Sequence, residues 1–411
     1  MNDLLRKDAE TIIRKAIDAV TPAYAVEKAL KRRAFPGKVY LVAAGKAAWK
    51  MAEAAARSMG DTLTAGVVVT KYGHAEHPLP KITCYEGGHP VPDEQGVKGT
   101  QAALELTRDL QRSDTVLFLL SGGGSALFEK PLIPLTELQS ITDQMLAAGC
   151  DIVEINTVRK RLSGVKGGKF AAWCAPAHVI SIVLSDVLGD PLDMIASGPT
   201  VPDRSTCEQA LEVICRYHIQ ISPQAEDCLR KETPKALPDA EAQIIGSVRQ
   251  LARAAADASQ ALGYTPVLLT DQLCCEAKDA GSFLGSILKT HANQGQKTAF
   301  LAGGETVVHV SGNGLGGRNQ EMALAAAQGI AGIQNAAVIC VGSDGTDGPT
   351  DAAGGYVDGD TLAALAEKGL SYASMMENHD AYHALEAVGG LIKTGPTGTN
   401  VNDIAVGLIG A

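Results

Sequence analysis

The chain has 411 residues and a formal net charge of −10, with 45% hydrophobic and 20% charged residues. This length predicts two domains of ordinary size, and the composition is typical of a globular protein. The acidic balance argues against nucleic acid or anionic membrane as a partner. No apolar run reaches the ~18 residues of a membrane span, and the N-terminus lacks the apolar core of a secretory signal. Nine cysteines without a C-x-x-C pair indicate a reducing compartment, so we expect a cytoplasmic protein.

In the first half of the chain, apolar strands run into loops of Gly, Ser or Asp. Residues 38–44 predict a strand that ends at Lys46, before a helix that continues to about Met59. The continuous apolar run 114–120 is typical of a buried parallel strand. It leads into five small residues that we interpret as an anion-binding nest for a phosphate or carboxylate group: Ser121, Gly122, Gly123, Gly124 and Ser125. A tight strand–helix turn would show the same letters.

Two further segments of this half carry charged residues that we consider functional. On a helix, Arg159, Ser163 and Lys166 would share one face, and we expect Arg159 and Lys166 to hold the anionic groups of a ligand. Residues 179–184 predict another buried strand, which ends in a loop with Asp186 and Asp190.

Residues 231–241 carry two prolines and several charges without an apolar period, so they form the best linker. We therefore expect an N-terminal domain over residues 1–235 and a C-terminal domain over residues 236–411, and we allow for the C-terminal tail to pack on the first domain. The second series of strands is expected to begin at residues 244–248.

Residues 303–322 form the richest motif of the chain. Glu305 follows an apolar strand, a β-rich segment covers residues 306–310, and a glycine-rich stretch precedes a helical pattern from Asn319 onward. Because bare glycines and free helix N–H groups suit an anion, we predict a phosphate site at Gly316 and Gly317, with Arg318 as a fixed cationic fork. A glycine-rich hairpin turn remains the alternative.

Other nucleotide and hydrolase motifs are absent or incomplete. Gly168 and Lys169 are followed by Phe170 rather than Ser or Thr, so the chain lacks a P-loop. A dinucleotide-binding fingerprint requires an acidic residue ~20 residues after the glycines, and here the acidic residue at the end of the next strand lies farther along the sequence. Gly123-Gly124-Ser125 begins like a nucleophile elbow, but Leu127 breaks the pattern.

Magnesium binds one or two carboxylates together with phosphate oxygens, and two acidic loops fit that requirement. Asp186 and Asp190 form the first, and Asp344 and Asp347 form the alternative. Asp186 is also our choice for the group that deprotonates an acceptor hydroxyl. Turn and helix capping would explain either loop without a metal.

Taken together, these motifs resemble the type-2 glycerate kinases, whose C-terminal domain is called MOFRL. The matching stretches are AAGKAAWKMA, SGGGSAL, INTVRKRLSGVKGGK, LSDVLGDPLDMIASGPT, GGETVVHVSGNGLGGRNQEMAL, SDGTDGPTDAAGG and TGTNVNDIAV. They extend from residue 43 to the C-terminal region and show no departure from the family pattern.

The resemblance implies two α/β domains, a larger Rossmann-like N-terminal domain with a parallel sheet and a smaller MOFRL-type domain, with the active site in the cleft between them. It implies phosphorylation of D-glycerate to 2-phosphoglycerate by ATP and Mg²⁺, with Lys46 and Arg318 as catalytic residues. An NAD(P)H-dependent hydroxypyruvate reductase is the alternative function. Glu305 and Asn319 complete the expected phosphate site, and a homodimer is one assembly that the sequence leaves open.

Overall fold

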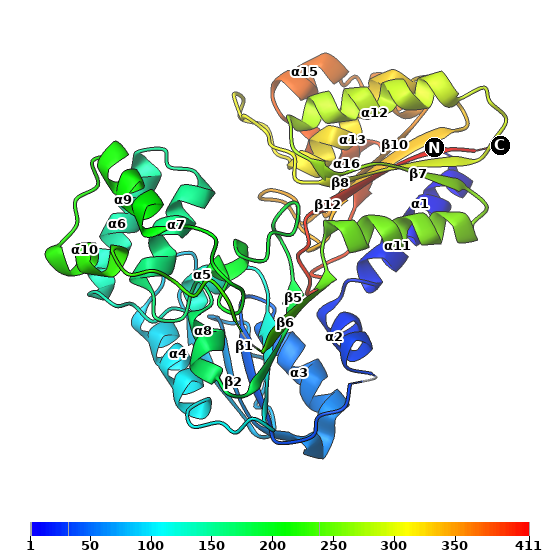
Figure 1. The fold of residues 1–411 in the computed structure, drawn as a ribbon. Helices are drawn as coiled ribbons and strands as arrows, with labels where there is room; N and C mark the ends of the chain where they lie inside the picture. Colours follow the sequence, from blue (N-terminus) through cyan, green and yellow to red (C-terminus); the bar gives the residue numbers. More distant parts are fainter. Residues whose placement is uncertain (1, 32, 238, 411) are drawn as a thin grey trace. The chain divides into compact units, whose positions relative to one another are not determined.

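A computed structural model describes residues 2–31, 33–237 and 239–410. The chain forms two compact units, which we call the N-terminal unit (Pro22–Ile245) and the C-terminal unit (Met1–Thr21 with Gly246–Ala411). Each unit is built on its own six-stranded sheet with helices packed against it (Figure 1). The chain is therefore an α/β protein, as predicted.

The sheet of the N-terminal unit has the strand order β3-β2-β1-β4-β5-β6. Its strands are β1 (Val39–Ala44), β2 (Leu63–Lys71), β3 (Ile82–Gly87), β4 (Thr115–Leu120), β5 (His178–Leu184) and β6 (Ala240–Gly246). The strands from β3 to β5 run parallel. Their carboxyl ends therefore meet at one edge, where ligands of open α/β sheets bind.

Helices cover both faces of this sheet because its strands are apolar on both sides. Leu41 and Ala43 pack in one layer, while Val42 and Ala44 pack in the other. The first layer contains α2 (Pro22–Leu30) and α3 (Ala48–Met59), and the second contains α4 (Glu94–Leu106), α5 (Gly124–Leu127) and α8 (Lys169–Cys174).

A separate helical cluster completes the N-terminal unit (Figure 1). It consists of α6 (Leu135–Ala147), α7 (Ile152–Leu162), α9 (Cys207–Arg216) and α10 (Pro223–Leu229), which share a core of their own. Helix α7 starts at a capping box in which Asp151 and Glu154 each accept a hydrogen bond from the other's backbone N–H.

The sheet of the C-terminal unit is mixed, with the order β11-β10-β9-β12-β8-β7. Its strands are β7 (Thr265–Leu273), β8 (Thr298–Gly304), β9 (Ala336–Gly342), β10 (Gly354–Asp358), β11 (Leu391–Ile392) and β12 (Asp403–Ile409). Strand β12 lies between β9 and β8 and is antiparallel to both. The C-terminal tail is thus a central strand in the sheet of its own unit, whereas we had allowed for it to pack on the first domain.

Helices α1 (Asp3–Asp18) and α11 (Val248–Ala261) cover one face of this sheet, and α12 (Ala277–His291) and α13 (Arg318–Ile330) cover the other (Figure 1). The short helices α14 (Thr361–Glu367), α15 (Tyr372–Glu377) and α16 (Ala381–Ala387) lie beside α13. Asn2 caps the N-terminus of α1, and its side chain accepts a hydrogen bond from the Leu5 N–H at 3.2 Å. Its apolar face is buried in the same core as α11.

The boundary between the units differs from the predicted one. It lies between Ile245 and Gly246 rather than after residue 235, because β6 pairs at the edge of the first sheet and does not open the second. The first 21 residues belong to the C-terminal unit because the apolar face of α1 fills its core. The expected strand over residues 306–310 is wrong, since only an isolated bridge between Glu276 and Val307 forms there.

Candidate active site

Lys46 lies directly after β1, beside the loop that follows β4. The Lys46 N–H donates a hydrogen bond to the Gly122 carbonyl at 2.8 Å, and the Ala47 N–H donates one to the Ser121 hydroxyl at 3.0 Å. Gly45 adopts a φ of 123°, a conformation that side chains rarely allow. The adjacent parallel strands therefore bring Lys46 and the glycine loop together at the predicted edge of the sheet.

Gly122 and Gly123 leave room for three functional side chains. A methyl group on Gly122 would collide with the carboxylate of Asp186, which follows β5. A methyl group on Gly123 would lie 2.9 Å from Cδ2 of His89 and 3.2 Å from Cγ of Lys46. Lys46, Asp186 and His89 thus converge on the glycine loop, and two of them, Lys46 and Asp186, are among the residues that we predicted to be catalytic.

The other members of the predicted nest divide into lining and supporting residues. Ser125, with Gly122 and Gly123, lines a cavity of about 640 Å³ in the N-terminal unit. Ser121 is buried and uses its hydroxyl to hold the Ala47 N–H. Gly124 packs closely on Ala196, which leaves no room for a side chain. Ser121 and Gly124 therefore shape the loop rather than line the cavity.

His89 was missed by the sequence analysis. It lines the same cavity, and burial, with the nearby charges of Lys46 and Lys71 and with His74, lowers its pKa below the ordinary value. A single histidine before a proline gives no recognisable motif, so its place became evident only from the approach of its ring to Gly123. The lowered pKa keeps the ring neutral near pH 7 and able to accept a proton or a hydrogen bond.

Arg159 and Lys166 do not share the helical face that we predicted, because α7 ends at Leu162 and Ser163 is extended. Arg159 lines the cavity, and burial lowers its pKa while Glu129 opposes that shift. The Lys166 side chain is fully buried, lies 3.2 Å from the Glu129 carboxylate and donates a hydrogen bond to the Phe128 carbonyl at 2.8 Å. Lys166 is therefore part of the core beneath the site.

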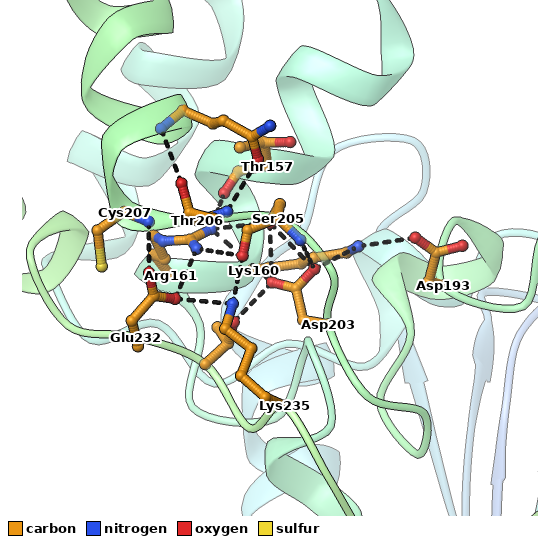
Figure 2. A network of polar contacts seen from close by, with 12 residues as sticks. Thr157, Lys160, Arg161, Asp193, Asp203, Ser205, Thr206, Cys207, Glu232 and Lys235 are labelled. Atoms are coloured by element: carbon orange, nitrogen blue, oxygen red, sulfur yellow. Dashed lines mark hydrogen bonds and ion pairs between the residues drawn. The ribbon is translucent and has the colours of Figure 1, made fainter.

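A buried polar network anchors α7, the helix that carries Arg159 (Figure 2). Lys160 donates a hydrogen bond to Asp203 at 3.1 Å and reaches Asp193 at 3.4 Å. Arg161 donates to the Ser205 carbonyl at 2.8 Å and to Glu232 at 3.1 Å. Asp193 belongs to the loop after β5, so the network fixes that loop relative to α7.

Arg318 is the first residue of α13, in the C-terminal unit. Its guanidinium donates to Asp403 at 2.6 and 3.1 Å and to Glu305 at 2.9 Å. Burial alone would lower the pKa of Arg318, but the hydrogen bonds of Asp403 and the negative charges of Asp403 and Glu305 raise it. These bonds use three of its five N–H groups, so Arg318 is a fixed cation with donors left for a ligand.

The N-terminus of α13 is occupied by a carboxylate of the chain itself. Asp347 accepts hydrogen bonds from the Asn319 N–H at 3.1 Å and from the Gln320 N–H at 2.8 Å. Gly317 is placed against Asp347 so closely that a methyl group would collide with it, and Gly316 lies against Ala381. The N–H groups of Asn319 and Gln320 thus hold the carboxylate of Asp347, and the phosphate site at Gly316 and Gly317 stays a prediction.

The two acidic loops differ in their fitness for a metal. Asp190 has a buried Oδ1 without a hydrogen-bond partner among the described residues, and Asp186 is in the same loop beside the glycines. Both carboxylate oxygens of Asp347 instead accept hydrogen bonds from backbone N–H groups of α13. Asp344 accepts a hydrogen bond from the Thr346 N–H at 3.0 Å. In residues 2–31, 33–237 and 239–410, no cluster of three or more metal-binding side chains occurs. The first loop therefore offers the better carboxylates, and a cation there would need ligand oxygens as well.

Within the described residues, no helix has the length and apolarity that crossing a membrane demands.

Two family models match the chain: a domain of unknown function, DUF4147, over residues 8–230, and the MOFRL family over residues 298–403.

Individual proteins match over almost the whole length. The D-glycerate 2-kinase of Thermotoga maritima is 50% identical, with 98% of each chain covered. The glycerate 2-kinase of Pyrococcus horikoshii is 41% identical over 98% of this chain and 97% of its own. A crystal structure of glycerate kinase from Thermotoga maritima superposes with a TM-score of 0.96 at 49% identity, covering 99% of this chain and 100% of the other.

Proposed function

We propose that this chain, which belongs to the glycerate kinase family, transfers the γ-phosphoryl group of ATP to the 2-hydroxyl group of D-glycerate. The observation that carries the proposal is the convergence of Lys46, the glycine loop and Asp186 in a chain half identical to a D-glycerate 2-kinase. The reducing conditions implied by its nine unpaired cysteines support a cytoplasmic enzyme.

The proposed roles follow from charge and position. Lys46 stabilises negative charge on the transferred phosphoryl group as a compact cation, and Arg318 does so as a rigid fork held by Asp403. Asp186 accepts the proton of the glycerate hydroxyl, and the neutral His89 beside it can orient that hydroxyl. Gly122, Gly123 and Arg159 hold anionic groups of the substrates at the cavity.

Magnesium fits the loop after β5. The partnerless buried Oδ1 of Asp190 and the carboxylate of Asp186 are the residues that would hold it, and the ion would neutralise charge on the nucleotide phosphates. The carboxylates around Arg318 also favour phosphates that arrive with a cation, since Glu305 and Asp403 together outweigh its single positive charge.

The test is a coupled assay of ADP release with D-glycerate, with the product identified as 2-phosphoglycerate by ³¹P NMR. Lys46→Ala and Arg318→Lys should each lower kcat by about 10²–10³-fold, because each removes an interaction with the charge of the transition state. Thermal unfolding controls for the fold. Wild-type turnover in both variants would refute the roles.

Lys46 and Arg318 belong to different units, and we propose that both act in the same chemical step. The double variant Lys46→Ala with Arg318→Lys should then lower kcat by far less than the product of the two single fold-losses. The reason is that residues that act as a unit have non-additive effects. Fully multiplicative losses of kcat would indicate separate steps.

The alternative function, a hydroxypyruvate reductase, has its own test. Oxidation of NADH in the presence of hydroxypyruvate would favour it, provided that ATP and D-glycerate together release no ADP.

A further inference from the structure

The cavity of about 640 Å³ beside the glycine loop, which we call the α6–α7 cavity, is larger and more apolar than glycerate requires. It is lined only by residues of the N-terminal unit. Its apolar walls include Val91, Leu146, Ile152, Val153, Leu188 and Met194. Glycerate is a three-carbon acid with a polar group on every carbon, so it would leave these walls without a partner.

Four of these apolar side chains are unusually exposed. The exposed fractions are 53% for Val91, 60% for Leu146, 60% for Ile152 and 50% for Val153. They come from three separate segments, the loop after β3, helix α6 and the first turn of α7, and they line one hollow. Exposed apolar side chains that gather around a concave surface mark a ligand site.

The cavity lining also includes polar groups. Gly122, Gly123, Arg159 and Asp186 contribute to the same cavity, and the Lys46 side chain runs beside Gly123. One wall is fixed by Gln139 of α6, whose amide donates a hydrogen bond to the Pro92 carbonyl at 2.8 Å. The cavity therefore joins a glycine loop with cations to an apolar hollow, which is the distribution of polarity along a nucleoside triphosphate.

We propose that the α6–α7 cavity binds the adenosine part of ATP, with the triphosphate directed toward Gly122, Gly123 and Lys46. This inference rests on the proposed function, because it assigns the nucleotide its place in that site. The apolar walls contact the purine and ribose faces, and the volume lies within the ~300–1,000 Å³ of small-molecule sites.

The experiment removes apolar surface without adding charge. The full-length protein carrying Leu146→Asn or Ile152→Thr is titrated with ADP and, separately, with inorganic tripolyphosphate by calorimetry. Each variant should bind ADP about tenfold more weakly and tripolyphosphate unchanged, because only ADP has a nucleoside to contact the walls. Both positions are exposed, so the fold tolerates the change. The matched control is Leu4→Asn, at a leucine of α1 that is 64% exposed and outside the cavity.

Steady-state kinetics separates this inference from the proposed function. We expect KM for ATP to rise about tenfold in the cavity variants and KM for D-glycerate to stay constant. Unchanged ADP affinity, an equal loss of tripolyphosphate affinity, or a rise in KM for glycerate alone would each overturn the assignment. If the wild type binds ADP through Leu146 and Ile152 yet forms no 2-phosphoglycerate, the cavity assignment stands and the proposed function fails.

Discussion

Lys166 illustrates how the role of one cation depends on its burial. From the sequence we placed it on one helical face with Arg159 and assigned it to the anionic groups of the substrates. In the structure its exposure is zero, and its ammonium lies between the Glu129 carboxylate and the Phe128 carbonyl. Burial is the largest influence on its pKa and lowers it, while the charge of Glu129 opposes that shift.

We expect Lys166→Met to destabilise the fold by about 3–5 kcal/mol at pH 7, because it removes the ammonium that pairs directly with the buried Glu129 carboxylate. Urea unfolding of the full chain measures this loss. The double variant Lys166→Met with Glu129→Gln should recover a large part of it, since the buried negative charge is then gone. A variant with unchanged unfolding but lost turnover would show instead that Lys166 acts on the substrates.

At the scale of elements, α13 was predicted correctly as a helix, although it begins at Arg318, one residue before the predicted start at Asn319. The occupant of its N-terminus was not predictable, because Asp347 arrives from a loop after β9. The preceding glycines make close packing possible: Gly312 and Gly314 lie against Asn378 and the residues that follow it. A glycine-rich sequence indicates that another group approaches the backbone closely, but it does not identify that group.

The buried carboxylate at this helix start should make stability depend on pH. Burial raises the pKa of Asp347 to about 6, although the backbone hydrogen bonds of Gln320 and Asn319 oppose the shift. Its pKa in the unfolded chain is about 3.9. The folded state therefore holds the proton more tightly, and the free energy of unfolding falls as pH rises from about 4 to about 6.

Asp347→Asn removes this titration. Relative to the variant, the wild type should lose about 1–3 kcal/mol of stability between pH 4 and pH 6.5, as a raised carboxyl pKa requires. Urea unfolding of both proteins at several pH values in this window gives the difference. If the stabilities of the two proteins instead change in parallel over this window, Asp347 is charged in the folded state throughout. The two backbone N–H donors, taken alone, would favour that charged form.

At the scale of the whole molecule, the sequence is most informative where the sheet is parallel. Lys46, Gly122 and Asp186 follow three parallel strands, so one rule about strand ends was enough to bring them together. The division of the chain into two units could not be predicted from a local rule of this kind. The amphipathic pattern of α1 identifies a helix with one apolar face. Its packing partner α11, however, follows the entire N-terminal unit in the sequence.

That arrangement makes α1 a test of which parts of the chain unfold together. Ile12 is completely buried against the C-terminal sheet, so Ile12→Ala should cost about 2–5 kcal/mol through lost packing and a cavity. Hydrogen exchange should accelerate in β8, β9 and β12, while β1, β4 and β5 keep their protection, because α1 belongs to the core of the C-terminal unit. Leu4→Ala, at an exposed position of the same helix, should change stability by about 0.5 kcal/mol or less. Equal acceleration in both sheets would mean that the two units unfold as one cooperative body, and acceleration confined to the first sheet would contradict the place of α1 in the second core.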